Sequence, residues 1–177
     1  MNYSITKYGK PLAKSLYTID ERTKTFSSNE SYLVLDFSNE YGWTFHTGSN
    51  CTFNTGYGCT FKTGWNCTFK TGDDCTFNTG DGCTFHTGYR CTFSAGDGCT
   101  FSTGSFCTFK TGDDCTFSIH NNFTKLETKG NSALLIRDKK QHAYLEEEVT
   151  LYYEGEILYT DDKLSLDEYL MLMELKK

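Results

Sequence analysis

The sequence predicts an all-β repeat protein, a β-solenoid, and three observations support this fold class. Nine Cys residues, from Cys51 to Cys115, follow one another at intervals of eight residues. Each is followed by Thr and then Phe, so the unit reads C-T-F-x-T-G-x-x. The 177 residues include a single Pro, as expected if most residues lie in stacked strands that need their backbone N–H. A fixed short period is typical of solenoids.

Each unit predicts a five-residue strand and a three-residue turn. Cys, Phe and the second Thr alternate with the first Thr and a variable residue, which is the period of a strand. Lysines such as Lys62 and Lys70 occupy the variable place, so this column faces outward and Cys and Phe face inward. The predicted core comprises Cys51, Phe53, Cys59, Phe61, Cys67, Phe69, Cys75, Phe77, Cys83, Phe85, Cys91, Phe93, Cys99, Phe101, Cys107, Phe109, Cys115 and Phe117.

The turn is predicted from its last position. Seven units have Asn, Asp or Gly there, the residues that most readily adopt a positive φ. They are Asn50, Gly58, Asn66, Asp74, Gly82, Gly98 and Asp114.

The number of units per coil is open, and two units, or sixteen residues, are preferred. Two facing sheets about 10 Å apart let Phe meet Phe across the interior. Three units per coil would give a more crowded triangular prism. An antiparallel meander is a further alternative, because a three-residue link also closes a hairpin. It would leave the Cys and Phe face without cover.

The period divides the chain into three parts. About eleven units span residues 35–122, residues 1–34 form an N-terminal capping segment, and residues 123–177 form a C-terminal cap. In the flanks we expect strands at 31–37 and 133–136 and a hairpin of 148–153 with 156–159 around Glu154-Gly155. Ser165-Leu166-Asp167-Glu168 is a capping box that predicts a terminal helix. Its apolar stripe is Leu166, Tyr169, Leu170, Leu172 and Met173.

With these motifs, the chain resembles the CTFxTG octapeptide-repeat proteins of phage and bacterial genomes. It is similar in style to pentapeptide- and hexapeptide-repeat solenoids. The segment Ala133-Leu134-Leu135-Ile136-Arg137-Asp138 loosely matches the strand-like ending of such arrays. The resemblance covers roughly residues 43–138 and implies a β-solenoid. It brings no catalytic residues.

Four chemical functions compete with structural explanations. The Cys column suggests a redox or metal ladder, but we interpret it as free thiols that act as small buried hydrophobes. Acidic turns such as Gly72-Asp73-Asp74 suggest Ca²⁺ binding, but the column is interrupted and ordinary turn chemistry explains it. Rows of Thr suggest ice binding, but their neighbouring column is mixed. The four His residues form no catalytic pattern. We therefore expect that the protein is not an enzyme and that it has no cofactor and no metal site.

Charge and hydropathy limit the classes of partner that we expect the chain to bind. A net charge of −6 argues against nucleic acid, and no apolar run is long enough for a membrane span. The N-terminal residues lack a signal-peptide pattern, so we expect a cytoplasmic protein, or a virion-associated one if phage-encoded.

We therefore expect a non-catalytic structural protein, a rigid spacer or an end-to-end self-assembling solenoid. The alternative is a module that presents a flat repeat face to a protein target. Its aromatic contacts would be Tyr57, Trp65, Tyr89 and Phe106. Ice binding is the third hypothesis.

Overall fold

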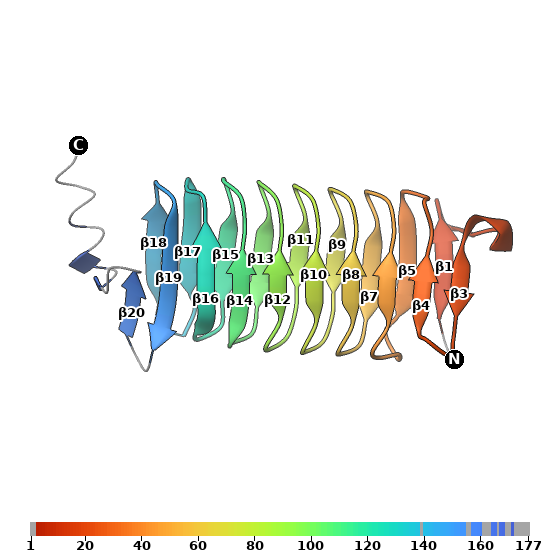
Figure 1. The fold of residues 1–177 in the computed structure, drawn as a ribbon, viewed down its shortest axis with the longest axis horizontal. Helices are drawn as coiled ribbons and strands as arrows, with labels where there is room; N and C mark the ends of the chain where they lie inside the picture. The colour runs from red at the N-terminus through yellow and green to blue at the C-terminus, as the bar shows by residue number, and fades with distance from the viewer. Residues whose placement is uncertain are drawn as a thin grey trace.

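The computed structural model describes residues 3–138, 140–154, 157–160, 164–165, 167–168 and 171. Its strands form two ten-stranded sheets that run along an elongated body (Figure 1). The chain alternates between the sheets, so Phe85 lies in register with Phe69 and Phe101, sixteen residues away on either side. This confirms the predicted solenoid with two units per coil. It excludes the triangular prism and the meander.

The first sheet, sheet A, holds in spatial order β2 (Lys10–Pro11), β1 (Ser4–Lys7), β5 (Leu33–Phe37), β7 (Thr52–Thr55), β9 (Thr68–Lys70), β11 (Thr84–His86), β13 (Thr100–Thr103), β15 (Thr116–Ile119), β17 (Ser132–Ile136) and β18 (Gln141–Leu145). The second, sheet B, holds β3 (Thr18–Asp20), β4 (Thr25–Ser27), β6 (Thr44–His46), β8 (Thr60–Lys62), β10 (Thr76–Asn78), β12 (Thr92–Ser94), β14 (Cys107–Lys110), β16 (Phe123–Thr128), β19 (Val149–Glu154) and β20 (Ile157–Thr160). A short 3₁₀ helix, η1 (Lys14–Leu16), precedes β3.

The repeat strands have three or four residues, so the predicted length of five is wrong. In sheet A, the reason for the later start of the strands lies at the Cys position. The Cys67 N–H donates to the sulfur of Cys83 in the next coil at 3.4 Å, instead of to a strand carbonyl. Regular pairing therefore begins one residue later, at Thr68 in β9.

The parallel array extends beyond residues 35–122 in both directions. It begins at β4, where Phe26 lies in register with Phe45, and it ends at β17, where Leu134 lies in register with Phe117. β4 keeps Thr25 and Phe26 of the motif but not its Cys and Gly, whereas β17 keeps only a buried apolar residue, Leu134, where the repeat has Phe. Burial at that position is therefore what the coil needs, because the stacked interior must be filled.

Antiparallel strands terminate both ends. At the N-terminal end β1 and β2 complete sheet A and β3 completes sheet B; at the other end β18 completes sheet A and β19 and β20 complete sheet B. The predicted strand at 133–136 is β17, and the predicted hairpin is the antiparallel pair β19–β20. Residues 155 and 156 of its turn lie outside the described residues.

The capping box at the predicted helix start is present. The Glu168 side chain accepts hydrogen bonds from the Ser165 N–H and hydroxyl, both at 2.8 Å, and Asp167, Glu168 and Met171 are helical. The predicted apolar stripe, Leu166, Tyr169, Leu170, Leu172 and Met173, lies outside the described residues.

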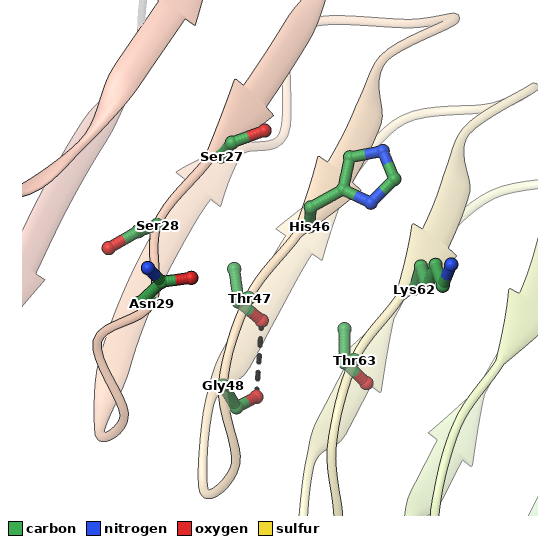
Figure 2. A pocket seen from close by; sticks show the side chains of 8 residues that line it. All are labelled: Ser27, Ser28, Asn29, His46, Thr47, Gly48, Lys62 and Thr63. Carbon is green, nitrogen blue, oxygen red and sulfur yellow. Dashed lines mark hydrogen bonds between the residues drawn. The ribbon is translucent and has the colours of Figure 1, made fainter.

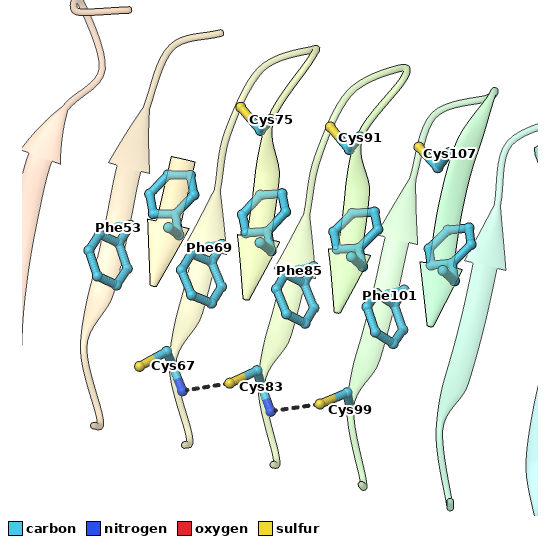
Figure 3. Packing of buried hydrophobic residues seen from close by; sticks show 14 of the residues in the cluster. Phe53, Cys67, Phe69, Cys75, Cys83, Phe85, Cys91, Cys99, Phe101 and Cys107 are labelled. Carbon is cyan, nitrogen blue, oxygen red and sulfur yellow. Dashed lines mark hydrogen bonds between the residues drawn. The ribbon is translucent and has the colours of Figure 1, made fainter. Parts of the chain in front are cut away.

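The core consists of two columns of stacked Phe rings flanked by two columns of Cys (Figure 3). Within a sheet, rings stack face to face, as for Phe69 and Phe85 with centroids 5.0 Å apart. Across the interior they meet edge to face, as for Phe85 and Phe93 at 5.1 Å and 75°. All eighteen predicted core residues are buried. Offset and perpendicular ring contacts of this kind add to the burial energy.

The turns follow the predicted chemistry. All seven Asn, Asp and Gly residues at the last turn position have a positive φ. Arg90 and Phe106 hold the same position in two further coils, with φ of 54° and 61°. The coil geometry therefore imposes this conformation even where the residue type does not favour it.

Candidate functional site

Two outward rows of side chains run along each sheet. On sheet A the first row is Thr52, Thr68, Thr84, Thr100 and Thr116, in register from coil to coil. The second row is Asn54, Lys70, His86, Ser102 and Ser118. Sheet B repeats the arrangement with a second row of His46, Lys62, Asn78, Ser94 and Lys110. Each face thus presents one rank of Thr beside a mixed polar rank.

The predicted aromatic contacts do not share a face. Tyr57, Tyr89 and Phe106 lie in turns that lead from sheet A to sheet B, whereas Trp65 lies in a turn of the opposite edge. All four side chains are exposed. Tyr57 also stacks on Tyr41, with centroids 5.0 Å apart and planes 2° apart. These residues therefore lie on two opposite edges of the solenoid and do not form one flat binding surface.

The acidic turn residues serve the backbone. Asp73 Oδ1 accepts the Tyr89 N–H at 2.9 Å, and Asp97 Oδ1 accepts the Asp113 N–H at 2.9 Å. Each carboxylate therefore accepts a turn N–H of the next coil, sixteen residues on, and links successive coils. Among the described residues, no group of three or more His, Cys, Asp or Glu is arranged to hold a metal ion.

The Cys column of sheet A forms a series of weak hydrogen bonds from coil to coil. The Cys83 sulfur accepts the Cys67 N–H at 3.4 Å (Figure 3). Its thiol can donate to the carbonyl of Asp81 or of Gly64, which lie 3.6 and 3.7 Å from the sulfur. At the end of the column the Ser132 hydroxyl replaces a thiol and accepts the Cys115 N–H at 3.2 Å. In the regular coils Cys combines an apolar body with a sulfur that both accepts and donates. Leu33, Trp43 and Phe123 fill the same position in outer coils, so burial is the feature that all coils share there.

The environment of these thiols opposes ionisation at most positions. In the sheet B column, a hydrogen bond that the Cys91 thiol donates to Cys107, together with burial, raises the pKa of Cys91 to about 11. Hydrogen bonds from the Cys67 and Cys99 thiols lower the pKa of Cys83, but its sulfur is fully buried. Burial keeps reagents away from all nine thiols, which the structure records as free.

A pocket of about 400 Å³ lies on the outer face of sheet B at the first coils (Figure 2). Three consecutive strands, β4, β6 and β8, and the segments that follow them provide its walls. It is lined by Ser27, Ser28, Asn29, His46, Thr47, Gly48, Lys62 and Thr63. The lining is polar, with two basic side chains and no carboxylate.

This pocket coincides with an interruption of the repeat. Inter-coil hydrogen bonds align Ser28 with Thr47 and Glu30 with Gly48, which leaves Asn29 as one residue more than the repeat has. Such insertions bulge the strand and redirect side chains, and they are common beside functional sites. The sequence pattern alone did not single out this region. Thr25 and Thr44 are register partners nineteen residues apart instead of sixteen, so this coil has three extra residues. Asn29 is one of them, and Ser38 and Asn39 are the other two, in the loop on the opposite edge.

Comparison of the chain with protein-family models, with curated proteins and with solved structures finds no match to any of them. Among the described residues, no helix has the length and apolar character to cross a membrane.

Proposed function

We propose that this protein is a non-catalytic structural element, a rigid rod that holds its two ends at a fixed separation. The observation that carries the proposal is the unbroken stack of rings through the body. From Phe45 to Phe117, rings two units apart stack with centroids 4.8–5.2 Å apart. Ten strands at about 4.8 Å per strand correspond to a rod roughly 45 Å long.

The N-terminal end favours a spacer over a filament. The outer strand of sheet A is β2, which has only two residues, Lys10 and Pro11. Leu12 donates its N–H to Ile5 in β1, so the neighbouring Pro11 faces the open edge and has no N–H to offer there. Short edge strands with Lys or Pro are a common means of preventing edge-to-edge pairing. End-to-end assembly through this edge is therefore the less supported role.

A distance measurement tests the rigid-rod proposal. The variant Arg22→Cys/Tyr144→Cys places one exposed thiol near each end, and spin labels attached there report the distribution of their separation. A narrow distribution that persists as salt and temperature change supports a rigid spacer. A broad distribution in the folded protein contradicts it, as does a filament seen by electron microscopy or a scattering length that grows with concentration.

A further inference from the structure

We propose that the pocket beside Asn29 binds an oxyanion, the phosphate, sulfate or carboxylate group of a ligand. The proposal concerns a site on the rod and does not depend on the spacer role. It arises from four polar side chains that line one hollow and have no hydrogen-bond partner among the described residues, those of Ser27, Asn29, His46 and Lys62.

The pocket gathers hydrogen-bond donors. Ser27 is the register partner of His46, and His46 is the register partner of Lys62, so the three side chains stand side by side at strand spacing. The side chains of Ser27, Asn29, His46 and Lys62 make no hydrogen bond or ion pair with any described residue. A hydroxyl, an amide, an imidazole and an ammonium are thus available to a ligand, and charge-assisted bonds to an anion are the strongest that they can form.

No carboxylate competes for these donors. The nearest acidic residue in the chain, Glu30, forms an ion pair with Lys7 at 2.5 Å. Within residues 43–122 the acidic residues lie in the turns instead of on the faces, as Asp73 and Asp97 do. A protein with a net charge of −6 therefore keeps a locally basic pocket at this position. An anion is the ligand class that fits it, because opposite charge attracts most strongly at short distance.

The opposite sheet supplies a matched control. Lys70 and His86 are also register partners on an outer face, so they reproduce the adjacent Lys and His of the pocket. Their strands keep the regular period and have no inserted residue corresponding to Asn29. Differences between the two pairs thus isolate the contribution of the pocket.

The test is an NMR titration of the full chain with inorganic phosphate and then sulfate, at fixed pH, with NaCl held at matched ionic strength. We expect the imidazole signals of His46 to shift in a saturable way and those of His86 to follow ionic strength alone. Lys62→Gln should weaken the apparent affinity about two- to fivefold, as expected for an exposed charge pair. Lys70→Gln should leave it unchanged. Asn29→Gly should weaken it as well, since this variant removes the amide and keeps the inserted residue.

Several outcomes would overturn the proposal. Equal shifts of His46 and His86, or a non-saturating shift at His46, would mean that the face responds only to bulk ions. Equal effects of Lys62→Gln and Lys70→Gln would mean the same. Both variants replace exposed side chains, and an unchanged circular dichroism spectrum verifies that they fold.

A second arm identifies the source of the anion. Sulfated dextran is added at the same concentration of sulfate groups as the inorganic sulfate. Neutral dextran, which has no sulfate groups, is the control for the polymer itself. Tighter binding of the polymer, lost in Lys62→Gln, indicates the anionic group of a larger ligand. Equal binding indicates a free small anion, and either result supports the site. Binding of neutral dextran with the same His46 shift contradicts it.

Discussion

The ring of Phe85 lies parallel to the ring of Phe101, sixteen residues later, with centroids 4.8 Å apart and planes 2° apart. Phe85 also meets Phe93 edge to face across the interior. Every interior ring of the array thus contacts rings in its own sheet and in the facing one. The stability of each coil therefore depends on its neighbours, as in other solenoids.

Replacing one interior ring tests this dependence. Phe85→Ala should lower the free energy of unfolding by about 3–5 kcal/mol, because it removes a fully buried side chain and leaves a cavity. The measurement is urea denaturation followed by circular dichroism. Phe106→Ala is the control, since Phe106 is 57% exposed in its turn, and we expect a change within about 0.5 kcal/mol. Equal effects of the two variants would contradict the account of the core.

The Cys columns lead to a prediction about reactivity. We expect none of the nine thiols in the native protein to react with a thiol-specific reagent at neutral pH, because each is at most 1% exposed. Mass spectrometry counts the labels, and the same reagent in urea should add nine. Selective native labelling of Cys83 would show that its lowered pKa dominates over burial.

The raised thiol pKa values predict a loss of stability in alkali. The pKa of Cys91 is about 11 in the folded protein and 9.0 as the ordinary value, so the folded state holds its proton more tightly. The resulting stability is present below pH 9 and is lost between pH 9 and about 11. The loss should be about 3 kcal/mol for this thiol, because one pKa unit corresponds to about 1.4 kcal/mol. The measurement is the urea midpoint of unfolding across this pH range. It should fall less steeply with pH in Cys91→Ala than in the unmodified chain, because groups other than Cys91 that titrate in alkali are the same in both.

Much of the fold could be predicted because the spacing of the repeat determines which residues face inward and which are in register. Cys and Phe at every eighth position fix the inward columns, and Lys62 and Lys70 fix the outward one. The ends were predicted less well. Phe26 is buried in register with Phe45, yet it lies nineteen residues away, so an eight-residue period does not reach it. Thr25 and Phe26 keep two motif letters, but without the Cys and Gly and out of step with the period they are too short a pattern to be recognised.

The candidate site was harder to predict than the fold. Trp65 follows Tyr57 by eight residues, which is half a coil, so their turns necessarily fall on opposite edges once a coil has two units. The pocket beside Asn29 depends on an insertion, and insertions are visible only against a known register. The sequence therefore predicts the regular surface of the solenoid better than the irregular places where ligands fit.

Glycine has two separate roles, which single substitutions should distinguish. A Cβ on Gly104 would lie 2.9 Å from the backbone of Gly88 in the preceding coil, whereas Gly98 has open space and a φ of +64°. Gly98→Ala should cost about 1–2 kcal/mol through left-handed backbone strain alone. Gly104→Ala should cost about 1–3 kcal/mol through crowding, since two backbones must separate.

A second substitution at each position separates these causes. Asn tolerates the left-handed conformation better than Ala. Gly98→Asn should therefore recover most of the stability lost in Gly98→Ala, whereas Gly104→Asn should be no better than Gly104→Ala. Urea denaturation of the four variants makes the comparison. Recovery at Gly104 would show that close approach is not what excludes a side chain there.

The coil repeat also predicts which insertions the rod accepts. A copy of the sixteen residues 67–82, inserted after residue 82, adds one strand to each sheet and lengthens the rod by about 4.8 Å without turning its ends. A copy of the eight residues 67–74, inserted after residue 74, adds half a coil and places the C-terminal cap on the opposite side. Four extra residues at the same place put the inward residues of later coils out of register with the Phe stack.

We expect the first two insertion variants to fold and the third to lose cooperative unfolding. X-ray scattering measures the length, and spin labels at positions 22 and 144 report the rotation. Equal stability of all three variants would mean that the eight-residue register does not govern the fold.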